Sequence, residues 1–283
     1  MSANPEILFG ARVPEQHADR MHATTPERTR SPVRRWLGLI PPLLVLLLGE
    51  LAVRQGWVSR NLLPAPSDVL RTLLELASQG LATHVLASTM RVAAGFALGA
   101  TLALITGAAV GLSRQTEALL DPSFQALRAS PSLAWVPLLL LWLGIDEASK
   151  IVLIAIGAFF PVYMGVSSGF RDIDRKLMEV GHMYGLGPLA LVRRVMFPAA
   201  LPPVFTGLRN GLSLAWMFMV AAELIAATKG LGYLLTDGRE TSRADIVLAA
   251  IVLLALVGKL SDSAMQHIEQ RLLRWRDTHD SGR

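Results

Sequence analysis

The chain has no cysteine among its 283 residues, so it can form neither a disulfide nor a thiolate metal site. Charged residues are also scarce at 17% and aromatic residues at 6%, whereas 52% of the residues are hydrophobic. The mean hydropathy of +0.43 is too high for an ordinary soluble domain. The composition therefore indicates an integral membrane protein.

Several sequence motifs are missing as well. No G-x-x-x-x-G-K-[ST] loop occurs, so nothing in the chain could cradle the phosphates of ATP. The histidines form no H-E-x-x-H or other metal-ligand spacing, and no G-x-S-x-G nucleophile motif is present. We therefore expect no enzyme activity, no metal and no cofactor in this chain.

The basic residues do not indicate nucleic-acid binding, although the net charge is +5 and the pI is near 10.1. They flank apolar stretches instead of forming one patch with interleaved aromatic residues. This is the distribution that membrane topology requires. The partner predicted from composition is thus the lipid membrane.

An all-α chain with about six transmembrane helices is predicted, because a helix needs about 20 mostly apolar residues to cross a bilayer. The membrane domain covers residues 33–276, between a disordered cytoplasmic tail at 1–32 and a short tail at 277–283. The expected spans are 36–53, 85–112, 124–143, 151–169, 199–227 and 244–260. An amphipathic helix capped by Ser67 or Asp68 should lie at the membrane surface after the first span.

Small residues and prolines give the spans distinct characters. The second span carries two G-x-x-x-G pairs, Gly95/Gly99 and Gly107/Gly111, which predict close packing against another helix. Prolines should interrupt the third span at Pro131 and Pro137 and the fourth at Pro161. Such breaks require neighbouring protein or water to satisfy the freed carbonyl groups.

The positive-inside rule predicts the orientation. Six spans place both termini on one side, and more basic residues gather at the span ends there than on the other side. The N-terminus and the loop 171–198 are therefore expected in the cytoplasm. The segment 229–243, with Gly230 and Gly232, is then a candidate outer gate or contact for an external partner.

The loop 171–198 is the longest polar excursion between two predicted spans. Asp172 or Asp174 can cap a short helix there, and Gly185, Gly187 and Pro188 end it. A second amphipathic piece, 189–196, leads into the next span. Two short helices at an angle would form a projecting knob.

This loop resembles the cytoplasmic loop of the permeases of ATP-binding-cassette importers, whose pattern is E-A-A-x(3)-G-x(9)-I-x-L-P. The two alanines, the isoleucine and the leucine are replaced here, but every spacing is kept. The matching residues are Glu179, Val180, Gly181, Gly185, Val195, Phe197 and Pro198. The alternative is that these residues form only a solvated turn between two helices and bind no partner.

The resemblance implies the type I importer permease fold in the bacterial inner membrane, with a coupling helix that docks on a separate ATPase subunit. ATP would be bound by that partner, a solute-binding protein would act outside, and a second permease subunit would complete the path, most simply as a homodimer. Gly185 would permit the sharp turn after the coupling helix.

Further segments are similar to the nitrate, sulfonate and taurine branch of these permeases, and most of all to the aliphatic sulfonate permeases. They are L-P-A-P at 63–66, L-R-A-S-P at 127–131, L-A-W-V-P at 133–137, W-L-G-I at 142–145, E-A-S-K at 147–150 and A-A-E-L-I at 221–225. The resemblance implies a small anion as the solute, an aliphatic sulfonate first, with taurine or nitrate as alternatives.

Charged residues inside spans are functional candidates because a bilayer makes them costly. Arg91, Arg209 and Glu223 are the deepest, so they are candidates for the solute path. The alternative is that each holds neighbouring helices together. Arg209 and Glu223 lie too far apart along one helix to pair with each other.

Two other function classes are open to a polytopic chain. A secondary transporter driven by an ion gradient would call for paired carboxylates near the midplane and inverted repeats, and we find neither. A membrane-embedded enzyme would need a catalytic set within the spans, and none is visible.

Overall fold

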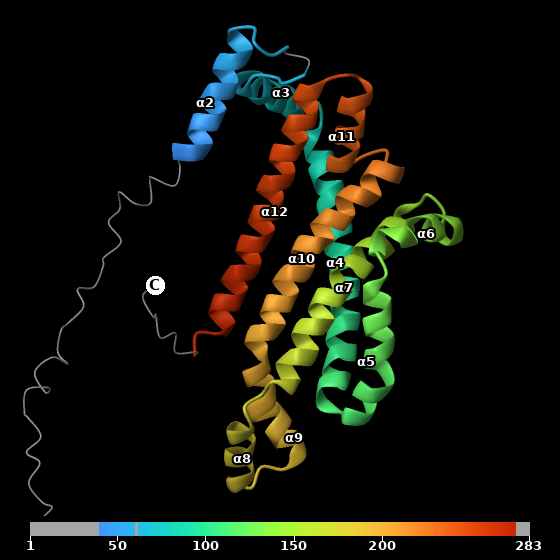
Figure 1. Cartoon of the computed structure of the whole chain (residues 1–283), viewed down its shortest axis with the longest axis vertical. Helices are drawn as coiled ribbons and strands as arrows, with labels where there is room; N and C mark the ends of the chain where they lie inside the picture. Colours follow the sequence, from blue (N-terminus) through green and yellow to red (C-terminus); the bar gives the residue numbers. More distant parts are fainter. Residues whose placement is uncertain (1–39, 60–61, 276–283) are drawn as a thin grey trace, which may run out of the picture. The chain divides into compact units, whose positions relative to one another are not determined.

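The computed structural model describes residues 40–59 and 62–275, and every regular element in these ranges is a helix (Figure 1). The predicted tails 1–32 and 277–283 lie outside the described residues, as does the beginning of the predicted first span. The chain divides into two units, Met1–Leu48 and Gly49–Arg283. The described part of the first unit is the apolar start of α2 (Ile40–Arg54), a helix whose charged residues are Glu50 and Arg54.

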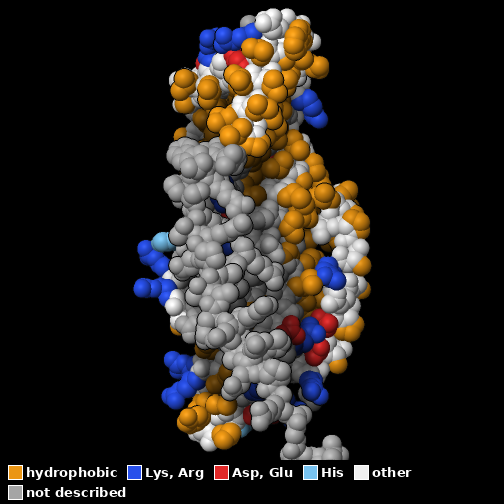
Figure 2. All heavy atoms as spheres, turned by 60° about the vertical axis from the view of Figure 1, so that its left-hand side comes forward, with side chains coloured by type: hydrophobic (Ala, Val, Ile, Leu, Met, Phe, Trp, Pro, Cys, Tyr) orange, Lys and Arg blue, Asp and Glu red, His pale blue; other side chains and the backbone are white. Residues whose placement is uncertain are grey.

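Within the described residues, four helices are long and apolar enough to cross a membrane. They are α4 (Leu81–Leu112), α7 (Glu147–Arg171), the helical stretch Pro188–Ile225 and α12 (Ala244–Leu272), and a bent pair of helices raises the count to five. On the face drawn in Figure 2, apolar side chains cover much of the described surface. The prediction of an all-α membrane domain is confirmed.

The predicted interruption of the third span, 124–143, at Pro131 is confirmed, whereas Pro137 lies in the first turn of a helix and causes no second break. The chain forms α5 (Arg114–Ala129), then the turn η2 (Ser132–Trp135) and α6 (Val136–Leu143), with a bend of 87° between the two parts. Pro131 causes the break, because the residue before a proline avoids the helical region and Ser130 is extended at φ −75° and ψ 134°.

Glycines bring α4 against α7, as the two G-x-x-x-G pairs predict. A methyl group on Gly95 would lie 2.6 Å from Cβ of Ile154, and one on Gly107 would lie 2.8 Å from Cβ of Val166. At Gly99 the methyl group would collide with the carbonyl oxygen of Ala155. The two helix backbones therefore approach as closely as they do only because these positions lack a side chain.

Helix α7 also packs along α10 (Phe197–Ala226), where Gly165 and Gly207 face each other across the contact. The predicted interruption of the fourth span at Pro161 does not occur, because α7 is continuous through it. Gly207 lies against the carbonyl group of Pro161, so the neighbouring helix fills the space there. Val162 and Val166 are buried in the core beside this contact.

Helix α3 (Pro66–Ser78) begins one residue earlier than predicted, and neither Ser67 nor Asp68 caps it. Ala65 occupies the N-cap position, and the Ser67 hydroxyl instead donates a hydrogen bond of 2.8 Å to the Glu50 carboxylate. A proline at the start needs no cap for its missing N–H, which removes one of the unsatisfied donors.

The loop 171–198 folds into α8 (Arg175–Met183), α9 (Pro188–Leu191) and a π-helical turn, η3 (Val192–Met196), that continues into α10. Figure 1 shows α8 and α9 as a hairpin at the beginning of α10, while α11 (Leu231–Glu240) follows its other end. Since α10 has 30 residues, about 45 Å of helix separates the two features.

Candidate functional site

The first turn of α8 is fixed by local polar contacts. The Asp174 carboxylate accepts a hydrogen bond of 2.9 Å from the backbone N–H of Lys176, so Asp174 is the predicted cap. Arg175 and Glu179 form an exposed ion pair of 3.0 Å one helical turn apart. Glu179, the first residue of the permease motif, therefore faces solvent on a short and well-defined helix.

Gly185 ends α8 with a φ of +69°, which side-chain-bearing residues rarely adopt. Its N–H donates to the carbonyl of His182 at 2.9 Å, and the N–H of Leu186 donates to the carbonyl of Gly181 at 3.1 Å. Together these bonds form a Schellman motif that closes the helix. The predicted sharp turn at Gly185 is confirmed.

Gly181 is the point at which α8 touches the following helical stretch. A methyl group there would collide with the side chain of Leu191, and it would lie 3.6 Å from Val195. Of the other motif residues, Glu179, Val180 and Phe197 are exposed. The motif thus divides into residues that hold the hairpin together and residues that it presents outward.

Large apolar side chains are exposed at the tip of this hairpin. Met183 is 86% exposed, Tyr184 83% and Leu189 82%, and Leu177 and Val180 are about half exposed on α8. Exposure of such apolar side chains to water is unfavourable and adds nothing to the stability of the hairpin. An exposed apolar patch with a charged rim is typical of a protein–protein contact.

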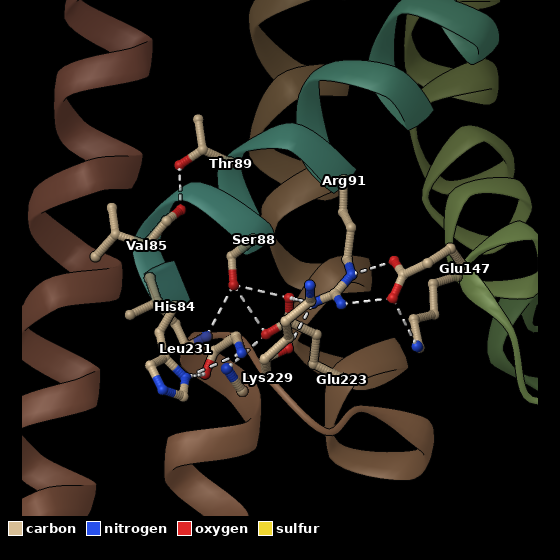
Figure 3. Close-up of polar contacts among 12 residues, drawn as sticks. His84, Val85, Ser88, Thr89, Arg91, Glu147, Glu223, Lys229 and Leu231 are labelled. Atoms are coloured by element: carbon tan, nitrogen blue, oxygen red, sulfur yellow. Dashed lines mark hydrogen bonds and ion pairs between the residues drawn. The ribbon is translucent and has the colours of Figure 1, made fainter. Parts of the chain in front are cut away.

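A buried ionic cluster lies at the other end of α10 (Figure 3). Arg91 on α4 is 4% exposed and Glu223 on α10 is 1% exposed, and a 2.7 Å ion pair joins them. Ser88, one turn before Arg91, donates to both Glu223 carboxylate oxygens at 2.7 and 2.9 Å. The buried carboxylate is thus fully engaged, which is the condition under which a protein interior tolerates a charge.

Arg91 also reaches α7. Its guanidinium forms two bonds of 2.6 Å with the carboxylate of Glu147, the first residue of α7. Lys150 adds a 3.2 Å bond to the same carboxylate. A bidentate arginine–carboxylate pair is strong and directional, so this single side chain connects α4, α7 and α10.

The turn after α10 closes on the same cluster. Arg91 donates 2.7 Å to the carbonyl of Lys229, and the N–H of Gly232 donates 2.7 Å to Glu223. Gly230 has a φ of +135°, and a side chain on it would collide with the Glu223 carboxylate. Because the Glu223 side chain occupies this space, only glycine fits at positions 230 and 232.

The predicted outer loop 229–243 is mostly the helix α11, anchored at both ends. At its far end, Asp245 accepts bonds of 2.7 Å from both Thr72 and Arg243. The hydrogen bond with Asp245 raises the pKa of the Arg243 guanidinium above its ordinary value. Gly230 and Gly232 let this segment pack onto Glu223, and its role as an outer gate or partner contact stays a prediction.

Arg209 occupies a different place from Arg91 and Glu223. It pairs with Asp262 at 3.0 Å and with Glu269 at 3.3 Å, both on α12. The structure therefore unites two of the three charged residues predicted for the solute path and separates the third. That Arg209 and Glu223 do not pair is confirmed, whereas a path role for all three stays a prediction.

A groove of about 670 Å³ lies between α7 and α10, beside the end of α5 and η2. Arg128 lines it, together with Ser132 and Asn210 and a larger set of apolar and small residues. Neither Arg128 nor Asn210 was predicted from the sequence as a site residue. The only sequence signal was the L-R-A-S-P segment, whose arginine lies just before the proline break.

Long apolar helices, a lined groove and a rigid hairpin that projects from them define a multi-pass membrane transport protein. The chain belongs to the family of binding-protein-dependent transport system inner membrane components, whose profile matches residues 95–274. It is therefore an inner membrane permease component and not an enzyme, and its family works with an ATPase subunit and a solute-binding protein.

Similar proteins support this assignment over most of the chain. The aliphatic sulfonates transport permease protein SsuC of Bacillus subtilis is 42% identical over 87% of this chain and 90% of its own length. The protein of the same name from Escherichia coli is 41% identical over 87% and 95%. The taurine transport system permease protein TauC of Escherichia coli is 34% identical over 88% and 96%.

The fold agrees with a solved transporter. An inward-facing structure of the MetNI methionine ABC transporter contains a chain that matches with a TM-score of 0.61 at 19% identity. The match covers 70% of this chain and 98% of that one. The predicted ABC importer permease fold is confirmed.

Proposed function

We propose that this chain is the permease of an ATP-driven importer for a small organic anion, an aliphatic sulfonate first. The observation that carries the choice of solute is the 41–42% identity to two aliphatic sulfonates permeases over 87% of the chain. Taurine, itself a sulfonate, is the alternative that the 34% identical relative supports. Either solute presents a fixed negative charge.

The hairpin 175–191 is the docking site for the ATPase in this proposal. Glu179 and Val180 would present the charged and apolar parts of α8, and Gly181 and Gly185 would hold its shape. ATP would bind to the partner, and this chain would hold no cofactor. What supports the assignment is the exposed apolar tip together with the kept motif spacing.

The helix from Pro188 to Ile225 offers a direct route from that hairpin into the bundle. Displacement of α8 and α9 by the ATPase would move the start of α10, whose far end carries Glu223. Two alternating states of the helices would then open the path to one side at a time. The competing class, an ion-driven secondary transporter, is disfavoured by the family match.

The assembly we propose contains two copies of this chain, two ATPase subunits in the cytoplasm and one solute-binding protein outside. The N-terminus and the hairpin would be cytoplasmic, as the basic residues near the span ends indicate. The binding protein would contact the face that carries α11. Arg91, Arg209 and Glu223 would act on the path by holding its helices together, since each is already occupied by ion pairs.

Growth of a deletion strain tests the solute. The strain should fail to grow with an alkanesulfonate as the sole sulfur source and recover when this gene is restored. Taurine as the sulfur source and nitrate as the nitrogen source are tested in parallel. Unimpaired growth on every alkanesulfonate, with loss on taurine or nitrate alone, would contradict the sulfonate assignment and name its replacement.

A further inference from the structure

The groove between α7 and α10 is open at the surface of the helical bundle, where Arg128, Thr206 and Asn210 are exposed. Its α10 lining extends from Pro203 to Phe218, the middle of a helix of 30 residues, and its α7 lining from Gly157 to Ser168. The volume of about 670 Å³ is in the range of small-molecule sites. Its position places any occupant at the depth of the lipid core.

Among the described residues that line the groove, Arg128 is the one with a charged side chain. Its guanidinium lies 2.7 Å from the sulfur of Met164, which is only a weak acceptor. Within residues 40–59 and 62–275 no carboxylate pairs with it, in contrast to Arg91 and Arg209. Arg128 is therefore an exposed cation, without a carboxylate partner among the described residues, at the depth of the spans, where such a charge is a candidate ligand position.

Two further donors face the same space. The Ser132 hydroxyl and the Asn210 amide line the groove, and neither has a hydrogen-bond partner among the described side chains and backbone. The hydroxyls of Ser168 and Thr206 differ, because they donate to carbonyls of their own helices. Arg128, Ser132 and Asn210 therefore form a set of free donors, which suits an oxyanion.

Apart from Ser168 and Thr206, the rest of the wall consists of apolar residues and glycine. Phe160 comes from α7, and Leu214 and Phe218 come from α10. A hydrated inorganic anion would gain nothing from these groups, whereas an alkyl chain would be removed from water by them. The site therefore matches a molecule with an anionic head and a short apolar tail.

We infer that the groove is a solute-binding site of the permease itself, in which Arg128 holds the sulfonate head and Phe160, Leu214 and Phe218 contact the alkyl tail. This deepens the proposed function and rests on it for the identity of the head group. The permease then discriminates among solutes, in addition to the binding protein. Selection for apolar tails would distinguish alkanesulfonates from nitrate at this site.

The test uses the complete importer, with ATPase and binding protein, in proteoliposomes loaded with ATP. Arg128→Gln removes the charge, Arg128→Lys keeps it, and Arg114→Gln is the matched control, since Arg114 is exposed at the beginning of the same helix. We expect Arg128→Gln to lower uptake of labelled butanesulfonate about tenfold or more per assembled complex. Binding-protein-stimulated ATP hydrolysis should persist, and Arg128→Lys should retain more uptake than Arg128→Gln.

A second variant tests the tail contact. Leu214→Ala should raise the KM for butanesulfonate several-fold more than the KM for methanesulfonate, because only the longer tail reaches the apolar wall. A purely structural role for Leu214 would change both alike. Uptake by Arg128→Gln within twofold of the wild type would overturn the site. If Arg128→Gln failed to assemble, Asn210→Ala would decide, since the site requires it to raise the KM and an unchanged KM refutes it.

These results separate the site from the proposed solute. If the wild type imports no sulfonate but imports another organic anion, the sulfonate assignment fails. The Arg128 variants are then measured with that anion, and an unchanged rate would refute the site as well. If the wild type imports butanesulfonate and Arg128→Gln does too, the function holds and the site alone is refuted.

Discussion

Glu223 depends on its neighbours for every charge-stabilising contact. Its carboxylate accepts bonds from Arg91, Ser88 and the backbone N–H of Gly232, and water does not reach it. A buried ion pair adds little to stability compared with an apolar core. Losing one member of it is costly, however, because the other charge remains buried without compensation.

Glu223→Gln is therefore expected to destabilise the solubilised permease by about 3 kcal/mol, because Arg91 would keep only one carboxylate partner, the half-exposed Glu147, beside the carbonyl of Lys229. For a chain of this size the melting temperature should fall by roughly 6–12 °C. Glu75→Gln changes an exposed glutamate and serves as the control. Equal melting temperatures for the two variants would show that the cluster is not a structural clamp.

Gly185 provides a second test at the scale of one residue. Gly185→Ala meets no atom within 4 Å, so its cost is the positive φ alone, about 1–2 kcal/mol. Gly187→Ala also meets open space but has an ordinary φ of −68°. We expect the first change to weaken ATPase binding about fivefold or more and the second to leave it unchanged.

Binding of the purified ATPase to permease in nanodiscs measures this difference. Equal dissociation constants for Gly185→Ala and Gly187→Ala would mean that the turn does not matter for docking. A loss in both variants would implicate the flexibility of the whole connection, and the assignment to one backbone angle would be wrong.

The sequence predicts single residues well where the cause is local. Gly185 follows a short amphipathic helix, and a glycine in that place ends it by geometry that no distant residue controls. The pairing of Arg91 with Glu223 could not be predicted, because it depends on how α4 and α10 pack. Arg128 was missed for the same reason, since its freedom from carboxylates is a property of its surroundings.

The contact of α4 with α7 could be predicted from the spacing of glycines in the sequence. Small residues recur on one face of the second predicted span, and that face is the one that α7 occupies. The break at Pro131 was predicted, whereas the size of the bend there and the helix α11 were not. Hydropathy alone treats 124–143 as one apolar run, and α11 is short, polar in part and fixed by contacts to Glu223.

Gly99→Ala tests that contact against a matched glycine. The added methyl group would meet the backbone carbonyl of Ala155, which cannot rotate away, so we expect a loss of about 1–3 kcal/mol. Gly258→Ala on α12 meets nothing within 4 Å and should be neutral or stabilise by up to about 1 kcal/mol. Thermal unfolding in detergent measures both, and a stable Gly99→Ala variant would show that the helices can separate without cost.

Within the Gly49–Arg283 unit, one helical stretch connects the hairpin to the buried ionic cluster. No break separates Pro188 from Ile225, and Glu223 near its end is bonded to α4 and to the start of α11. A shift of the hairpin along this stretch cannot be absorbed by a flexible joint within α10. The energy of docking can therefore reach the far end through packed and hydrogen-bonded groups.

The absence of cysteine makes the proposed orientation directly testable, because any introduced thiol is the only one in the chain. Tyr184→Cys places it at the exposed tip of the hairpin, and Glu240→Cys places it at the exposed end of α11. These positions flank α10, so a membrane between them leaves one thiol on each side. A membrane-impermeant maleimide applied to spheroplasts should label Glu240→Cys, and Tyr184→Cys should react only after lysis. Labelling of Tyr184→Cys in intact spheroplasts would show that the topology is the reverse of the proposed one. The hairpin would then lie outside, where a cytoplasmic ATPase could not bind it.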